Sequence, residues 1–209
     1  MAARECLAAA RRTCSRCVDF GSKFQWARTN RNFSVYVKSD IGQKRQLSSV
    51  EVTKALTDRI VRLDGALRSY ATRTFELALA QAREVDRELA SGKVRGPLHG
   101  VPIAVKDLCN TKGIPTAAGM AIYKDYRPDE DATVVTRLRD AGAVLLGKLQ
   151  MTEGAYGQHH PSITPPVNPW SSEHWTGVSS SGSGVATAAG LCFGSLARIL
   201  WGRSASRRP

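Results

Sequence analysis

The sequence predicts an α/β domain in which helices flank a parallel sheet. Helix-like segments precede an apolar segment at 101–106, and another precedes a second apolar segment at 143–146. Helices that alternate with short apolar strands are typical of parallel sheets covered on both faces. A run rich in glycine and serine at 176–190 then gives a loop whose backbone can approach a ligand closely.

Two helices are expected before the first strand. Ser48 and Glu51 have the spacing of a capping box, so the first helix begins there, and Gly65 is expected to end it. The second helix runs from about Phe75 to Leu89, with apolar residues at helical spacing on one face and mixed charges on the other. Both helices are interpreted as scaffold.

Two parallel strands are expected, at 101–106 and at 143–146. A helix is expected between them, capped by Asp131 and ending near Ala141. The first strand ends in Lys106. Burial disfavours a charged ammonium and lowers the pKa of a lysine, so a buried Lys106 could act as a general base. The ordinary alternative is a lysine at a strand end that reaches solvent.

The glycine- and serine-rich run leads into a small apolar segment, and a helix is expected to start at about Val185. A flexible linker is the alternative for a run of this composition. None of its serines has glycine at both the −2 and +2 positions, so the nucleophile elbow of α/β-hydrolases is excluded.

The strand that ends in Lys106 and the run that contains Ser179 together resemble the amidase signature family, amidohydrolases with a Ser–cis-Ser–Lys triad. The resemblance covers about 48–196 and implies the amidase signature fold, with a mixed, mostly parallel sheet flanked by helices, incomplete at this length. It implies that Lys106 is the catalytic lysine and that Ser179, in a cis peptide, is the bridging serine. Val178 stands where the family usually has a second glycine. The family needs no metal or organic cofactor, and Lys148 lies too close to the serine run for the family's spacing.

The same resemblance places the nucleophilic serine at position 203, where this chain has Arg203. Residues 197–209 are arginine-rich and lack the glycines that would expose a serine and form an oxyanion hole. The chain is therefore expected to be catalytically incomplete. The abrupt change after Leu196 indicates a frameshift, a retained intron or a truncated gene model.

Three function classes are compatible with these features. The first is a fragment of a hydrolase that cleaves the C–N bond of a small-molecule amide. The second is a fragment of the A subunit of a tRNA-dependent glutamyl amidotransferase, and the third is a non-catalytic truncated product that binds a ligand or partner. A homo-oligomer or an amidotransferase complex would be the corresponding assembly, and no substrate-binding residue is assigned.

The charge of the chain is uneven. Of the 209 residues, 1–45 carry ten Lys/Arg against three acidic residues, and 197–209 carry four Arg and no acid, whereas 46–196 are nearly balanced. These three ranges are the predicted basic extension, the N-terminal part of the domain and an aberrant tail. The balanced middle gives no nucleic-acid footprint, and no apolar run is long enough to span a membrane. Localisation is expected to be cytoplasmic, with a mitochondrial transit peptide as the alternative interpretation of 1–45.

The remaining metal- and pocket-like residues are interpreted as structural. Cys14 and Cys17 form a CxxC pair without further ligands, and His159 and His160 are expected to be solvated loop residues rather than metal ligands. The tryptophans before the serine run, Trp170 and Trp175, are expected to be packing residues, and the resemblance implies a place in the wall of the substrate pocket as the alternative.

Overall fold

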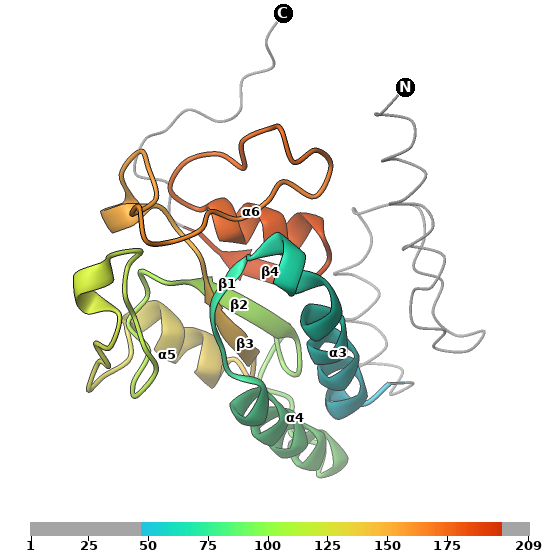
Figure 1. Cartoon of the computed structure of the whole chain (residues 1–209). Helices are drawn as coiled ribbons and strands as arrows, with labels where there is room; N and C mark the ends of the chain where they lie inside the picture. Colours follow the sequence, from blue (N-terminus) through green and yellow to red (C-terminus); the bar gives the residue numbers. More distant parts are fainter. Residues whose placement is uncertain (1–46, 198–209) are drawn as a thin grey trace, which may run out of the picture.

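The computed structural model describes residues 47–197, and a four-stranded sheet lies at their centre (Figure 1). The strands are β1 (Tyr70–Arg73), β2 (Pro102–Lys106), β3 (Val144–Leu149) and β4 (Gly194–Leu196), in the spatial order β1-β3-β2-β4. β2 runs parallel to β3 and β4, and β1 is antiparallel to β3. The predicted α/β class with a mixed, mostly parallel sheet is confirmed.

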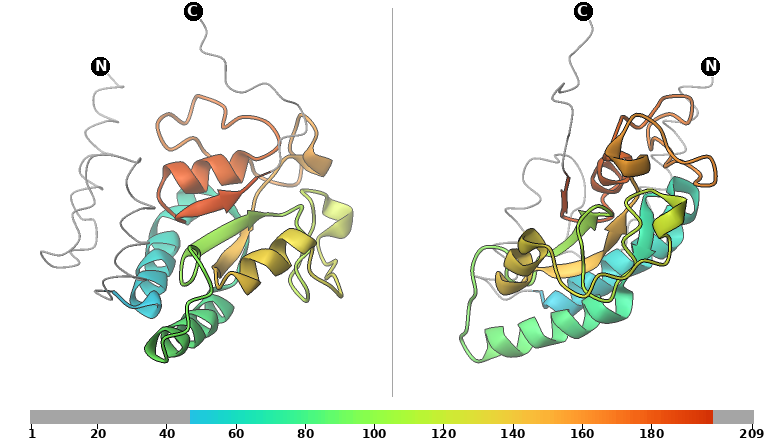
Figure 2. Two further views of the ribbon diagram at one scale, coloured as in Figure 1. Left: turned by 180° about the vertical axis from the view of Figure 1, so that it is seen from behind. Right: turned by 90° about the vertical axis from the view of Figure 1, so that its left-hand side faces the viewer.

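Helices cover both faces of this sheet. The helices α3 (Ser49–Leu67), α4 (Phe75–Ala90) and α6 (Ser181–Ala188) share one buried core with β3, while α5 (Thr133–Asp140) lies on the opposite face (Figures 1 and 2). Two short 3₁₀ turns, η2 (Ala121–Tyr123) and η3 (Glu153–Ala155), lie in the connections. The main core contains Val52, Leu56, Ile60, Ala82, Val85, Leu89, Leu146, Leu149, Ala186 and Leu191.

The capping box of α3 is confirmed, because Ser48 accepts a hydrogen bond from the Glu51 N–H and Glu51 accepts one from the Ser48 N–H. The expected stop at Gly65 is wrong. The helix continues through it to Leu67 and ends where Arg68 adopts a left-handed conformation with φ 56°. Packing of the apolar face outweighs the small helix penalty of one glycine.

The expected capping role of Asp131 is also wrong. α5 begins at Thr133 and has Ala132 as its N-cap, without a side-chain hydrogen bond. The Asp131 carboxylate instead accepts from the Lys112 N–H at 2.7 Å and pairs with Arg139 of the last helical turn. It therefore ties the loop before the helix to the far end of the same helix.

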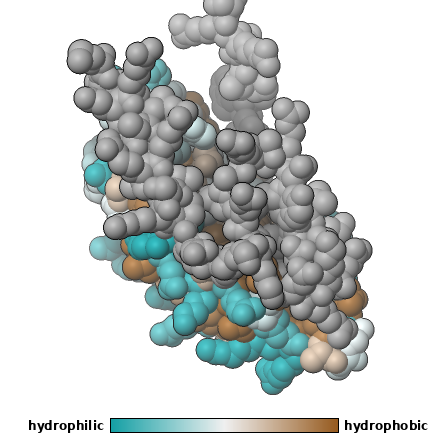
Figure 3. Space-filling model, turned by 90° about the vertical axis from the view of Figure 1, so that its right-hand side faces the viewer, coloured by the Kyte–Doolittle hydropathy of each residue, from teal (hydrophilic) through white to brown (hydrophobic). Residues whose placement is uncertain are grey.

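The side of the molecule where α3 and α4 lie is patterned in small hydrophilic and hydrophobic areas outside the grey atoms (Figure 3). None of the helices within 47–197 has the length and apolar character that a membrane span requires. The predicted extension 1–45 and the tail from 198 onward, with Arg203, lie outside the described residues.

Candidate active site

Lys106 is the last residue of β2, a strand buried at every position between β3 and β4. Only 1% of Lys106 is exposed. The predicted burial of this lysine is therefore confirmed, and the alternative in which its amine reaches solvent is excluded. An amine buried this deeply requires polar partners, because an unpaired buried polar group is costly.

One of those partners is Ser179. The Lys106 Nζ donates to the Ser179 Oγ at 2.5 Å, across 73 positions of sequence. Ser179 is 4% exposed and lies in the loop just before α6. The two residues that the sequence singled out from separate segments are thus in direct contact inside the protein.

The backbone at Ser179 differs from the expectation in one respect. No peptide bond within 47–197 is cis, whereas the resemblance implied a cis bond at Ser179. The residue instead has a left-handed conformation, with φ 67°. A left-handed residue turns the chain sharply without the cost of a cis bond, and this turn directs the hydroxyl to Lys106.

The start of α6 fixes the position of this loop. The helix begins at Ser181, four residues earlier than the expected start at Val185. Gly182 makes the early start sterically allowed, because a Cβ at this position would lie 2.5 Å from the Ser69 carbonyl oxygen and 2.6 Å from backbone atoms of Gln150. The Gly182 N–H donates to the Gln150 carbonyl at 3.0 Å, so the helix N-terminus is anchored to the residue that follows β3.

His159 lies beside the serine loop and is half-buried, so its expected solvation is only partly right. Its Nε2 is 3.0 Å from the Ser181 Oγ, while its Nδ1 is buried without a hydrogen-bond partner among the described residues. Burial lowers the pKa of His159, so the imidazole is neutral at pH 7. The neighbouring His160 has only a local contact, with Ser162. Sequence alone gives no signal that separates these two adjacent histidines.

A cavity of about 530 Å³ opens next to His159. Trp175 lines it and is 61% exposed, and Trp170 is 71% exposed, so the expected packing role of both tryptophans is wrong. The other lining residues are Gly157, Gln158, His160, Pro161, Ile163 and Pro165. Apart from the two histidines, this lining carries no ionisable side chain.

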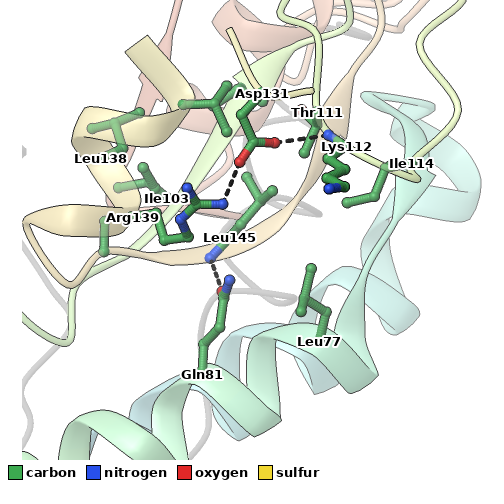
Figure 4. Close-up of a pocket in the computed structure, with 13 residues that line it drawn as sticks. Leu77, Gln81, Ile103, Thr111, Lys112, Ile114, Asp131, Leu138, Arg139 and Leu145 are labelled. Carbon is green, nitrogen blue, oxygen red and sulfur yellow. Dashed lines mark hydrogen bonds and ion pairs between the residues drawn. The ribbon is translucent and has the colours of Figure 1, made fainter. Parts of the chain in front are cut away.

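A second cavity, of about 240 Å³, lies on the α5 face of the sheet (Figure 4). Its floor is apolar, and its polar side chains Gln81, Asp131 and Arg139 are occupied by structural contacts. Gln81 accepts from the Leu145 N–H at 2.8 Å, and Asp131 holds Arg139 and the Lys112 N–H. Because Gln81, Asp131 and Arg139 already have partners within the protein, we assign this cavity no part in the chemistry.

A second buried lysine, Lys148, is fully enclosed at the end of β3. Its Nζ donates to the Cys109 carbonyl at 2.7 Å and to the Thr116 Oγ1 at 2.6 Å, and lies 3.5 Å from the Asp107 Oδ1. Unlike Lys106, Lys148 makes no hydrogen bond to Ser179 among the described residues. Asp107 was not predicted as a site residue, although its place directly after Lys106 is a usable signal.

Within 47–197, no three His, Cys, Asp or Glu side chains are grouped so that they could hold a metal ion. The two described cysteines, Cys109 and Cys192, are free thiols. The candidate site within these residues therefore consists of the Lys106–Ser179 pair, the neighbouring Ser181–His159 pair and the cavity beside His159.

Comparisons with known proteins give a consistent assignment. A family model described as Amidase matches residues 51–198. AmiD of Mycobacterium tuberculosis (strain ATCC 25618 / H37Rv) is 61% identical over 158 residues, which cover 76% of this chain and 33% of AmiD. The A subunit of the glutamyl-tRNA(Gln) amidotransferase of Moorella thermoacetica is 46% identical over 157 residues, covering 74% of this chain and 32% of that relative.

Among solved structures, the native peptide amidase from Stenotrophomonas maltophilia has a TM-score of 0.69 and 38% identity, and the match covers 76% of this chain and 34% of that enzyme. The chain thus spans about a third of the length of the curated relatives that it matches.

Proposed function

Because the chain belongs to the amidase signature family, we propose that Lys106 and Ser179 are two members of a proton relay for hydrolysis of carboxylic amide C–N bonds. The observation that carries this proposal is the 2.5 Å contact between the Lys106 Nζ and the Ser179 Oγ in a buried site. A lysine kept from water gives up its charge more readily, and a neutral amine can accept a proton.

The relay works in sequence. Neutral Lys106 takes the hydroxyl proton of Ser179, and Ser179 takes the proton of a third residue, the nucleophile, as its oxygen attacks the amide carbonyl carbon. Backbone N–H groups at the nucleophile stabilise the oxyanion. The relay then returns the proton to the departing amine, and water hydrolyses the acyl ester. None of these steps requires a metal or an organic cofactor.

This polypeptide is proposed to lack turnover, because Arg203 occupies the position at which the resemblance puts the nucleophile. An arginine side chain is protonated at neutral pH and cannot form the acyl ester. Loss of a nucleophile from residues that act as a unit typically reduces turnover by about 10⁶-fold.

The test is ammonia release from simple carboxamides by the purified full chain, beside a Lys106→Ala variant. We expect no release above the uncatalysed rate from either protein. Hydrolysis by the wild-type chain that disappears in Lys106→Ala would refute the proposed inactivity and support the relay. Hydrolysis that survives in Lys106→Ala would refute the role of the lysine.

A role in an amidotransferase complex is the second candidate, favoured by the 46% identity to the A subunit of a glutamyl-tRNA(Gln) amidotransferase. Glutaminase activity that arises only with added partner subunits would support it. A non-catalytic ligand-binding product is the third candidate. Calorimetric titration with carboxamides separates it from the others, since it requires binding without turnover even when partner subunits are present.

A further inference from the structure

The two buried lysines lie on opposite faces of the sheet, and a β-bulge is the cause. Ile103 pairs with Leu145 but Val105 pairs with Lys148, so β3 contains one more residue than β2 between these pairs. An extra residue reverses the alternation of side chains along the rest of the strand. Leu149 therefore joins the core on the α3 and α6 face, and Lys148 faces the connection that follows β2.

Gly147 allows this bulge. Its φ is +155°, and a Cβ at this position would lie 2.3 Å from the Thr72 carbonyl oxygen of β1. A residue with a side chain could not adopt this backbone at this distance from the edge strand. The separation of the two amines therefore depends on this one glycine.

The contacts of Lys148 suit a protonated amine beside an ionised Asp107. The Thr116 hydroxyl donates to the Ile114 carbonyl, so it accepts the hydrogen bond from Lys148. The Cys109 carbonyl can only accept as well. A neutral amine would have two N–H donors for these two acceptors and would direct its lone pair towards the Asp107 carboxylate. An ammonium instead places its positive charge on the Nζ 3.5 Å from the Asp107 Oδ1, as an ion pair.

Asp107 is held by backbone N–H groups of the connection that follows β2. Its Oδ2 accepts from the Ala117 N–H at 3.1 Å, and its backbone carbonyl accepts from the Ala118 N–H at 3.2 Å. Burial raises the pKa of Asp107 and lowers the pKa of Lys148, and the opposite charge of each residue counters this effect on the other. The pair fastens the connection after β2 to β3, directly beside Lys106.

We propose that Lys148 is a positioning residue for Lys106: its ammonium binds the Asp107 carboxylate on the face of the sheet away from Ser179. Without Lys148, the charge of this carboxylate, on the residue next to Lys106, would be uncompensated and would favour the charged form of Lys106, and a protonated Lys106 cannot act as a base. This inference rests on the proposed base role of Lys106. It adds that the base depends on a second lysine that never touches the serine.

Lysine-selective ¹³C,¹⁵N NMR of the full chain tests the proposal, because the side-chain nitrogen shift separates amine from ammonium. Signals are assigned with Lys106→Met and Lys148→Met. In the wild-type chain, we expect Lys148 to remain an ammonium from pH 6 to 9 and Lys106 to show an amine fraction at the alkaline end. In Lys148→Met, we expect the amine fraction of Lys106 at pH 8 to fall by at least about tenfold.

The double variant Lys148→Met/Asp107→Asn removes the carboxylate charge as well and should restore the amine fraction of Lys106 to within about twofold of wild type. Lys124→Met is the matched control, because Lys124 pairs at 3.9 Å with the residue that follows it, Asp125, on the surface. It should leave the Lys106 signal unchanged. Circular dichroism checks the fold of every variant.

A folded Lys148→Met chain with an unchanged Lys106 signal would overturn the proposal, and so would a wild-type Lys148 signal in the amine form. If Lys148→Met does not fold, the Asp107→Asn variant is used: it must shift Lys148 towards the amine, and an unchanged Lys148 signal would overturn the pairing on which the proposal depends. A wild-type Lys106 that is an ammonium at every pH would refute the base role itself. The pairing of Lys148 with Asp107 is then still read from the Lys148 signal in Asp107→Asn.

Discussion

Replacing Gly182 by alanine tests how α6 is held against the sheet. The new methyl group would lie 2.5–2.6 Å from backbone atoms of Ser69 and Gln150, closer than carbon contacts allow, and backbone cannot rotate away. Overpacking of this kind costs about 1–3 kcal/mol. The higher helix propensity of alanine returns only about 1 kcal/mol. We expect a net loss of up to about 2 kcal/mol, or up to about 8 °C in Tm for a domain of this size.

Gly184 in the same helix is the matched control. Its nearest neighbour for an added Cβ is the Thr176 carbonyl oxygen at 3.9 Å, an ordinary contact. Gly184→Ala should therefore stabilise the chain by about 0.5–1 kcal/mol, because alanine loses less backbone entropy than glycine. Urea and thermal unfolding measure both variants. Equal effects of the same sign would show that α6 is not packed against Gln150 as described.

Three further outcomes follow from the same structure. Gly147→Ala should destabilise more than Gly182→Ala, because both its φ of +155° and a 2.3 Å contact forbid a Cβ; a Tm within about 1 °C of wild type would contradict the bulge. His99 is buried, and burial lowers its pKa, so the unfolded chain binds more protons at this residue than the folded chain does. The free energy of unfolding should therefore fall as the pH drops below about 6.5. In His99→Gln, the urea midpoint should change less with pH in this range. Burial raises the pKa of the Cys192 thiol to about 12, so mass spectrometry after iodoacetamide treatment at pH 8 should find Cys192 modified only in the unfolded chain.

Glu88, which contacts His99, contributes to the loss of stability at lower pH. Hydrogen bonds from Arg95 and Lys93 lower the pKa of Glu88 from 4.5 to about 2. A lowered carboxylate pKa stabilises the fold above pH 4.5, and this contribution is lost between pH 4.5 and 2. The His99 Nδ1 accepts from the Arg95 N–H, so its Nε2 carries the proton and donates to Glu88. Histidine and carboxylate thus act in different pH ranges although they are in contact.

Regular patterns in the sequence predict the scaffold well. The capping box at Ser48, the amphipathic helix from Phe75 and the strand at 101–106 form as expected, because local propensity and burial agree there. The second apolar strand also forms, but it runs to Leu149, three residues beyond its expected end. The strand β1 was missed: it has only four residues, and its alternation of buried and exposed positions is incomplete. Its pairing with β3 is a tertiary contact that no local signal encodes.

In the candidate site, too, one contact was predicted from the sequence and another was not. The contact between Lys106 and Ser179 was predicted from two segments in family order, and the structure brings the two side chains together. The contact between His159 and Ser181 was not predicted, because it depends on the path of an irregular loop of about twenty residues. Loops of this length carry little periodic information, and the distinction between His159 and His160 exists only in three dimensions.

The two lysines show why spacing alone was insufficient. The sequence set Lys148 aside because it lies too near the serine run, but the structure gives a different reason, which is that Lys148 faces away from Ser179. In an unbroken strand, Leu146 and Lys148 would share a face, and an ammonium would enter the apolar core beneath α3 and α6. The bulge at Gly147 prevents this, and it is set by the distance to the Thr72 carbonyl on another strand. The position of one glycine relative to a neighbouring backbone thus determines which of two buried amines meets the serine.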